Sequence, residues 1–144
     1  MKIILILVSL YFTSSEASPV VKNQTVFDLA FAKSIAAKAA DCAHKNNWKV
    51  SIAIVNSEGN LVYFERNDHA YTGSIEASIQ KAKSANAFQR PTSSFVESVK
   101  QGRVGLLTVK DVVVIEGGVP ILIEGKHAGA IGISGAKSIE DEQC

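Results

Sequence analysis

Side chains able to bind a ligand gather in one short stretch of the sequence. Arg66, Asp68 and His69 lie close together, and Tyr71 follows them. A guanidinium can bind a carboxylate through two parallel hydrogen bonds, and an imidazole can ligate a metal ion. Because binding residues are often carried on loops held by rigid elements, we expect this loop to form the rim of a ligand site. The structural alternative is an ion pair between Arg66 and either Asp68 or Glu65.

The other two histidines, His44 and His127, stand in different contexts. His44 is near the end of the first predicted helix, where the helix dipole stabilises a cation. It is therefore a second candidate metal ligand, with helix-end stabilisation as the alternative. His127 falls in a predicted turn between strands, where exposure to water is the default.

The stretch GGVPILIEGKHAGAIGISG, residues 117–135, raises the question of a phosphate-binding loop. Neither GxGxxG nor GxxxxGK[ST] occurs in it. Glycine in a strand instead leaves a flat patch that a backbone or a ligand can approach closely. Ser134 lies in GISG, which is not the GxSxG of hydrolases, and HExxH is absent. We predict a strand pair here, no nucleotide loop, and no catalytic residue of these types.

The composition is that of an ordinary globular protein. Apolar residues make up 47% of the chain and charged residues 20%, and the net charge is +1. There is no basic excess to attract nucleic acid and no acidic tail. A small-molecule ligand or a protein partner must therefore be recognised by local features of the surface.

Residues 1–17 are typical of a secretory signal peptide. Lys2 precedes an apolar run of ten residues, and Ser15 and Ala17 have the small-residue spacing of a signal-peptidase site. A membrane span needs about 20 apolar residues, so this run is too short to be one. We expect a single secreted or periplasmic domain over 18–144, with no membrane attachment after cleavage.

The two cysteines, Cys42 and Cys144, allow several states. An oxidising compartment permits a disulfide between them. A buried thiol with a free terminal thiol is at least as good an interpretation. A terminal cysteine can also form a bridge between two chains. Asn23 begins a glycosylation sequon, although Thr25 is better explained as the cap of the first helix. Two cysteines without CxxC spacing argue against a zinc site.

Hydrophobic periodicity and turn residues predict an α+β protein with a central, mostly antiparallel sheet of about five strands flanked by helices. We expect Ser74 and Thr92 to cap the second and third helices. The predicted helices span 26–45, 75–89 and 92–100, and the predicted strands span 49–55, 61–66, 104–109 (weakly), 111–116, 119–124 and 127–134.

Three blocks of the sequence resemble the GlcG/HbpS-like family, a haem-binding or haem-degrading type of domain. They are VSIAIVNSEGNLVYFERNDHAYTGSI, IQKAKSANAFQRPT, and the pair GGVPI and GAIGISG, with EDEQ near the end. The resemblance implies a profilin- or PAS-like fold and self-assembly, often into octamers. It also implies haem binding, haem breakdown or redox sensing. Arg66, Asp68, Ser74 and Lys81 match the polar positions of the family.

The sequence departs from the family pattern at two places. His69 stands where a smaller residue, often glycine, is common. The chain also stops at Cys144, whereas relatives usually continue into a C-terminal helix. We expect that helix to be missing, which would expose apolar surface or alter assembly.

The expected function is binding of haem or a related tetrapyrrole, with weak oxidative degradation because bound haem can activate oxygen against its own ring. His69 and His44 are the candidate iron ligands. The other candidate cofactor contacts are Arg66, Asp68, Ser74 and Lys81, although for Lys81 a solvated structural role beside Glu76 is favoured.

Two alternatives to haem binding stay open. One is a non-catalytic binding or sensing module for a small anionic metabolite. The other is an interaction protein whose assembly is its function, and a homo-oligomer is expected in either case.

Overall fold

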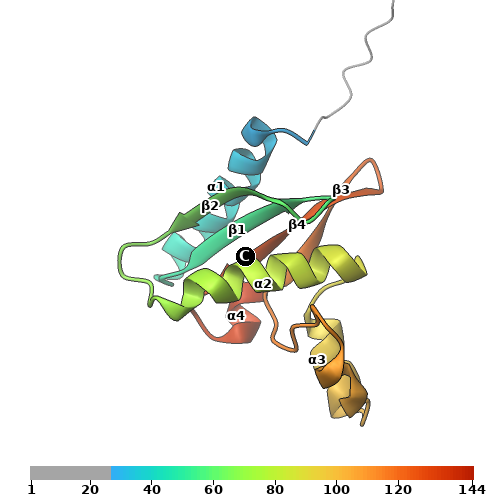
Figure 1. The fold of residues 1–144 in the computed structure, drawn as a ribbon. Coiled ribbons are helices and arrows are strands. Elements are labelled where there is room, and N and C mark those ends of the chain that lie inside the picture. Colours follow the sequence, from blue (N-terminus) through green and yellow to red (C-terminus); the bar gives the residue numbers. More distant parts are fainter. Residues whose placement is uncertain (1–26) are drawn as a thin grey trace, which may run out of the picture.

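The computed structural model describes residues 27–144, in which a four-stranded sheet is covered by helices on both faces (Figure 1). In chain order the elements are α1 (Leu29–Lys45), β1 (Ser51–Asn56), β2 (Leu61–Arg66), α2 (Gly73–Phe88), α3 (Ser93–Lys100), the 3-10 helix η1 (Val104–Thr108), β3 (Gly118–Ile123), β4 (Lys126–Ser134) and α4 (Ser138–Gln143). The predicted signal peptide, Asn23 and Thr25 lie outside the described residues.

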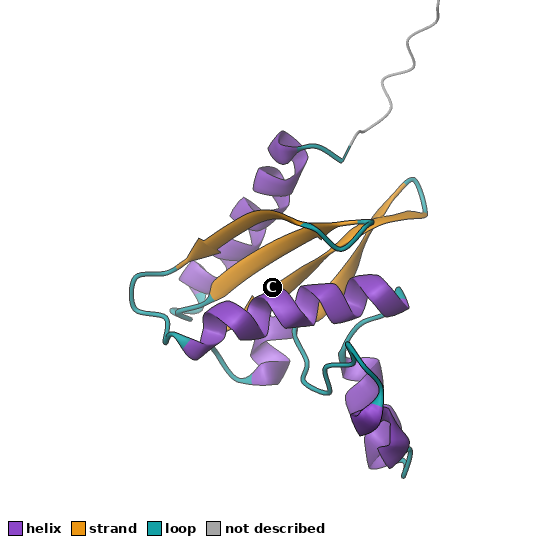
Figure 2. Ribbon diagram, in the orientation of Figure 1, coloured by secondary structure: helices purple, strands orange, loops and turns teal. Residues whose placement is uncertain are grey.

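The sheet has the strand order β2-β1-β4-β3, and all neighbouring strands are antiparallel. Successive side chains of a strand point to opposite faces, so each strand contributes to two clusters. Ile52 and Ile54 of β1 pack in the cluster on the α1 side, whereas Ala53 and Val55 pack in a second cluster with alanines of α2. Figure 2 shows the sheet between these two helices. The predicted α+β architecture is confirmed.

Helix α1 begins later than the sequence predicted. Its N-cap is Asp28, whose side chain accepts a hydrogen bond from the Phe31 N–H at 2.8 Å. The predicted start at residue 26 is therefore wrong, because an aspartate carboxylate satisfies the free N–H groups of the first turn. The buried side of α1 is made of alanines at helical spacing, Ala32, Ala36 and Ala39 among them.

The glycine-rich stretch forms the β3–β4 hairpin, as predicted, but two of its glycines, Gly118 and Gly132, face the protein's own helix α2. A side-chain carbon on Gly132 would collide with the Ser78 carbonyl oxygen, and one on Gly118 would collide with the Lys81 carbonyl oxygen. The space that we expected a neighbouring chain or a flat ligand to use is filled by the backbone of α2. Glycine is needed here because helix and sheet approach closely.

Two predicted strands are wrong, which reduces the sheet from about five strands to four. Residues 104–109 contain the 3-10 helix η1, and residues 111–116 form an irregular segment. The β-branched run at 111–116 has no neighbouring strand, and the Val113 N–H donates instead to the Ser84 hydroxyl at 3.0 Å. With α3 and η1, this segment forms a lobe that projects from the sheet (Figure 1).

The C-terminal residues form a short helix and a disulfide. Residues 138–143 are helix α4. Cys42 of α1 and Cys144 after α4 form a disulfide with an S–S distance of 2.06 Å. Between residues 27 and 144, no helix has the length and apolar character needed to cross a bilayer.

Candidate functional site

A pocket of about 180 Å³ lies where the C-terminal end of α1 meets one end of the sheet. Its apolar walls come from both elements and from the turn that joins them: Ala40, Ala43, Trp48, Val50 and Ile52. Its polar side chains stand at the same end of the sheet: His44, Lys49, Glu65, Arg66 and Asn67. Small-molecule sites combine apolar walls with convergent polar groups, and here the polar share is high, since half of the lining side chains are polar or charged.

The way α1 ends brings His44 and Arg66 to this pocket. The Asn47 N–H donates to the His44 carbonyl at 3.0 Å, and Asn47 has a φ of 58°. This turn reverses the chain into β1, whose first residue, Ser51, pairs with Arg66 at the end of β2. The last turn of α1 therefore lies over the end of β2. Of the six site residues that the sequence predicted, His44 and Arg66 are thus brought together in one pocket.

Arg66 has no carboxylate partner in the described part of the chain. Within residues 27–144 the ion pairs are Lys81–Asp141 and Lys137–Glu140. The predicted structural alternative, a pair with Asp68 or Glu65, is not formed. Arg66 is also exposed. Its guanidinium can therefore bind a carboxylate from outside the protein by donating two parallel hydrogen bonds to it.

Glu65 is the one carboxylate among the side chains of the pocket, and it is already engaged. The Tyr63 hydroxyl donates to Glu65 Oε2 at 2.7 Å. This hydrogen bond raises the pKa of Tyr63 above its ordinary value, and burial and the negative charge of Glu65 act in the same direction. The carboxylate is thereby held on the Tyr63 side of the strand.

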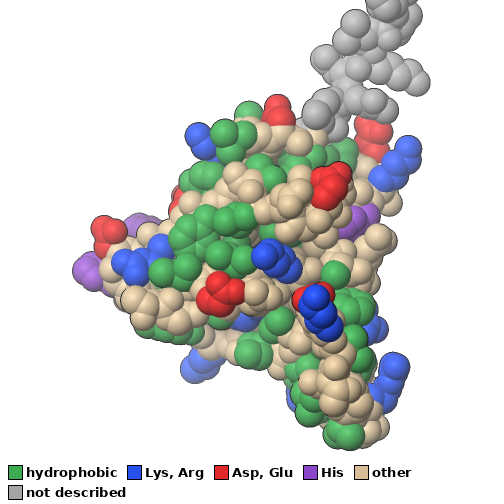
Figure 3. Space-filling view, viewed as in Figure 1, with side chains coloured by type: hydrophobic (Ala, Val, Ile, Leu, Met, Phe, Trp, Pro, Cys, Tyr) green, Lys and Arg blue, Asp and Glu red, His purple; other side chains and the backbone are tan. Residues whose placement is uncertain are grey.

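His69 and Asp68 lie in the exposed loop between β2 and α2, beside the pocket but not among its lining residues. The His69 N–H donates to the Asn67 side chain at 3.0 Å, which shapes this loop. Figure 3 shows histidine, basic and acidic side chains gathered at this end of the molecule. The predicted loop thus borders the pocket through Asn67. The only hydrogen bond of His69 outside regular secondary structure among the described residues is made by its backbone N–H.

Ser74 is inside the protein and does not cap α2. The N-cap is Thr72, and Ser74 is the second residue of the helix. Its Oγ lies 2.7 Å from Ser51 Oγ and donates to the Tyr71 carbonyl at 2.6 Å. Ser74 is fully buried between α2 and β1 and is not among the residues that line the pocket. The predicted cap is wrong because the side chain turns toward the sheet.

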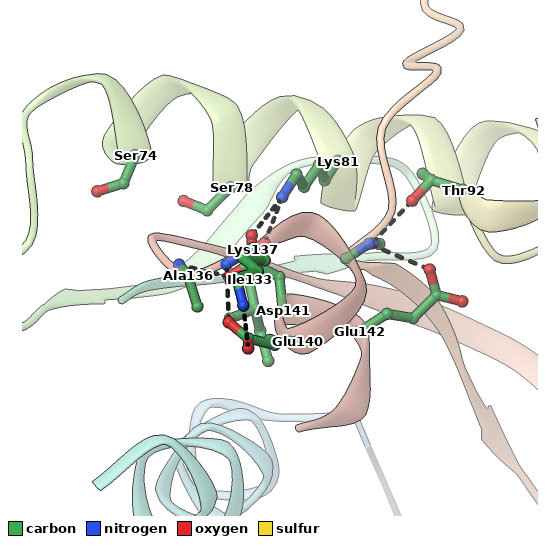
Figure 4. Close-up of polar contacts among 12 residues, drawn as sticks. Ser74, Ser78, Lys81, Thr92, Ile133, Ala136, Lys137, Glu140, Asp141 and Glu142 are labelled. Carbon is green, nitrogen blue, oxygen red and sulfur yellow. Dashed lines mark hydrogen bonds and ion pairs between the residues drawn. The ribbon is translucent and has the colours of Figure 1, made fainter. Parts of the chain in front are cut away.

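Thr92 stands at the N-cap position of α3, as predicted, but its side chain makes no capping hydrogen bond. Its hydroxyl accepts from the Gly118 N–H at 3.0 Å instead. Thr92 therefore fastens the start of β3 to the segment between α2 and α3 (Figure 4).

Lys81 is also internal, which corrects the expectation of a solvated lysine beside Glu76. Only 2% of its side chain is exposed. Its ammonium donates to Asp141 Oδ2 and to the Ile133 carbonyl, each at 2.9 Å (Figure 4). The carboxylate of Glu76 instead accepts a hydrogen bond from the Gln80 side-chain amide. Lys81 thus joins α2, β4 and α4 and contributes to structure.

His127 is not the solvated turn residue that the sequence suggested, because it belongs to β4. Its Nε2 is buried and has no hydrogen-bond partner among the described residues. Within the same residues, no three His, Cys, Asp or Glu side chains are placed to hold a metal ion. This finding does not bear on His44 or His69 as a haem ligand, because a macrocycle supplies the other nitrogens and a single histidine is enough.

The chain is similar to several known proteins. Protein GlcG of Escherichia coli (strain K12) is 34% identical over 113 residues, which are 78% of this chain and 84% of GlcG. A crystal structure of a doubly substituted HbpS from Streptomyces reticuli is 26% identical with a TM-score of 0.75, over 94% of this chain and 92% of that one. A PduOC–haem complex, at 23% identity and a TM-score of 0.74 over 83% and 89% of the two chains, shows the same fold.

Residues 27–144 match the family described as "Haem degrading protein HbpS-like". The match covers every described element, including the β1–β2 hairpin and the β3–β4 glycine stretch that carried the resemblance in the sequence. The chain therefore belongs to the HbpS-like family.

Proposed function

We propose that this protein binds haem or a related tetrapyrrole at the pocket between α1 and the end of the sheet. His44 would ligate the iron, and Arg66 would bind a propionate. The observation that carries the proposal is that these two residues line one apolar-walled pocket and that Arg66 has no carboxylate partner among residues 27–144. Membership of a family described as haem-degrading supports it.

The pocket is smaller than the roughly 300–1,000 Å³ of sites that enclose a ligand. The pocket would therefore hold only part of a tetrapyrrole, with Trp48 among the residues that contact it. A second copy of the chain would have to cover the remainder. His69 and Asp68 on the adjoining loop would lie beside the uncovered part, so His69 is kept as the second candidate ligand.

In the proposed reaction the protein would bind and orient the haem, and the haem would supply the redox chemistry. Haem, when bound, would supply oxygen activation, and with dioxygen and an external electron donor it would permit weak oxidative degradation of its own ring. The apolar wall would exclude water from one edge of the ring, and Arg66 would fix its orientation through the propionate. No nucleophile or general base is required of the protein for this reaction.

Export is part of the same proposal. The Cys42–Cys144 disulfide supports it, because disulfides persist in secreted and periplasmic proteins and are rare in reducing compartments. Residues 1–17 would be the signal peptide and residues 18–144 the mature protein. Mass spectrometry of the protein recovered from the host's extracellular or periplasmic fraction should find Ser18 at the N-terminus.

Hemin titration tests the proposed site. The purified protein should give a saturable Soret shift, and His44→Ala should lose the spectral signature of histidine ligation. Arg66→Ala should keep that signature and weaken binding. His127→Ala is the matched control, because His127 is a histidine of β4 and does not line the pocket. A signature that persists in His44→Ala and disappears in His69→Ala would move the axial site to the loop.

A second candidate is favoured by the volume and charge of the pocket. About 180 Å³ with Lys49 and Arg66 at the rim suits a small anionic metabolite. No Soret shift, together with calorimetric binding of small carboxylates that Arg66→Ala abolishes, would favour this function over haem binding.

A further inference from the structure

We propose that this protein has a second ligand site, which binds a small molecule carrying a primary ammonium group. The site is a pocket of about 420 Å³ between the β1–β2 turn, the C-terminal end of α2 and the segment that follows η1. It lies at the opposite end of the β1–β2 hairpin from the pocket proposed for haem. The proposal therefore does not depend on haem binding.

The second pocket is polar and carries more negative than positive charge. Its charged side chains are Glu58 of the β1–β2 turn, Lys83 of α2, and Asp111. None of the three forms an ion pair within residues 27–144. The volume falls within the roughly 300–1,000 Å³ of small-molecule sites. The pocket is therefore large enough for a small ligand and has two carboxylates free to bind a cation.

Asn86 of α2 lines this pocket and supplies the observation that points to a ligand. Only 7% of the residue is exposed. Its Nδ2 donates to the Ser57 carbonyl oxygen at 3.1 Å, whereas its Oδ1 is buried with no hydrogen-bond partner among the described residues. Because a carbonyl oxygen can only accept, the contact with Ser57 fixes which end of the amide carries the N–H groups. The Asn86 Oδ1 is therefore an acceptor that lacks a donor.

The end of α2 adds to the demand for a positive charge. The C-terminal end of a helix carries a partial negative charge that a cation stabilises, and the last turn of α2 contains no basic residue. Asp111 is held near the helix because the Val113 N–H donates to the Ser84 hydroxyl of α2 at 3.0 Å. Negative groups from the β1–β2 turn, from α2 and from the segment after η1 thus surround one pocket.

An ammonium group meets both demands of the pocket. Its charge suits Glu58 and Asp111, and its N–H groups can donate to the Asn86 Oδ1. A metal ion is less suitable, because no three His, Cys, Asp or Glu side chains of residues 27–144 are placed to hold one. An unpaired buried acceptor costs free energy, and a ligand N–H removes that cost. Since the Oδ1 is shielded, side chains at the mouth of the pocket must move aside as the ligand enters.

Three small compounds separate the charge from the hydrogen bond. Ethanolamine carries an ammonium at neutral pH, tetramethylammonium carries the charge without an N–H, and ethylene glycol carries donors without the charge. In NMR titrations of the isotope-labelled protein, ethanolamine should shift the amide signals of residues 57–59 and 87–89 saturably. It should bind at least about tenfold more tightly than either other compound. Equal binding of tetramethylammonium, or no saturable shift with ethanolamine, would overturn the proposal.

Variants at exposed positions test the site without disturbing the fold. Glu58→Gln and Asp111→Asn should each weaken ethanolamine binding about two- to fivefold, the range of an exposed ion pair. Glu97→Gln is the matched control, because it removes an exposed carboxylate that does not line this pocket. The control should bind as the wild type does. Equal losses in all three variants would reveal a general effect of net charge and refute a specific site.

A crystal structure of the wild-type protein soaked in ethanolamine tests the role of Asn86 without altering it. We expect the ammonium nitrogen within hydrogen-bond distance of the Asn86 Oδ1. A water molecule in that position, with no ethanolamine in the pocket, would mean that the unpaired acceptor serves only to hold water and that the proposal is wrong.

Discussion

The Lys81–Asp141 pair is an ionic contact with almost no access to water, since each side chain is 2% exposed. Lys81 also donates to the Ile133 carbonyl, and Asp141 Oδ1 accepts from the Ala136 N–H at 2.9 Å. Each charge is therefore both paired and hydrogen-bonded. Such a pair adds little net stability compared with an apolar contact, but the removal of one partner leaves an uncompensated buried charge.

We expect Asp141→Ala to lower the free energy of unfolding by about 3–5 kcal/mol, because the Lys81 ammonium would lose its counterion inside the protein. The double variant Lys81→Met/Asp141→Asn should be more stable than Asp141→Ala, since it removes both charges and keeps an acceptor for Ala136. Urea unfolding followed by circular dichroism measures both. A loss below 1 kcal/mol in Asp141→Ala would contradict this account of the pair.

The chemistry of individual site residues could be predicted only in part. The sequence identified Arg66 and His44 as candidate ligand-binding residues. It did not show that the turn at Asn47 brings the two side chains to one pocket. Lys81 was placed in solvent because helix lysines usually are. The small residues that surround it on α2, such as Ser78 and Ala82, were the signal that this face is buried. Its partner Asp141 is 60 positions away, and no local pattern connects the two.

At the scale of elements, the position of α2 depends on glycines in the strands beneath it. Gly132 of β4 lies under Ser78 and Ala82 of α2, where an added side-chain carbon has no room. Helix and sheet can therefore approach more closely than side chains would allow. The same approach buries the Ser74–Ser51 contact and the Lys81 ammonium, which depend on it.

Gly132→Ala should destabilise the protein by about 1–3 kcal/mol or more, because α2 must move away from β4 to admit the methyl group. Gly105→Ala is a suitable control: a methyl group there would meet no atom within 4 Å, and Gly105 does not have a positive φ. The control should stay within about 0.5 kcal/mol of wild type. Thermal unfolding of the three proteins makes the comparison, and similar shifts in both variants would refute the close-packing explanation.

Most elements could be predicted because their patterns are local. The alternation in 49–55 and 61–66 indicated the first hairpin, and the glycine stretch indicated the second. Residues 111–116 have equally strong β propensity, yet they form no strand. A strand needs a partner as well as suitable residues, and here Val113 bonds to a serine hydroxyl instead.

At the scale of the whole molecule, the Cys42–Cys144 disulfide links the first helix to the last residue. Its sequence separation is 102, so the bond constrains a large part of the unfolded chain. Glu142 adds two contacts to the same end, accepting from the Ser93 hydroxyl at 2.5 Å and the Gly117 N–H at 3.2 Å. The C-terminal residues thus fasten α1, α3 and the sheet together.

The Cys42→Ser/Cys144→Ser variant should lose about 4–5 kcal/mol of stability, the value that chain entropy gives for a loop of about 100 residues. Reduction of the wild-type protein should have a similar effect, whereas the variant should not respond to reductant. Urea midpoints with and without reductant provide the test. Equal midpoints in all four samples would show that the bond does not contribute to stability.

The pairing of the cysteines could not be predicted, because Cys42 is inside a helix and the chain ends at Cys144. Their Cα atoms lie 5.5 Å apart only after α4 returns the chain to α1. In the projecting lobe, helix α3 was predicted, whereas η1 and the irregular segment 111–116 were not. The exposed apolar side chains of the lobe include Val104, Leu107 and Ile115. Figure 3 shows hydrophobic side chains on the projecting part of the surface.

That lobe lies between the two cysteines, so the polypeptide from Cys42 to Cys144 is topologically a ring. A protease that cuts one peptide bond in the lobe would open the ring without releasing either piece. Nicked molecules would migrate as one band on a denaturing gel without thiol and as two fragments once thiol is added.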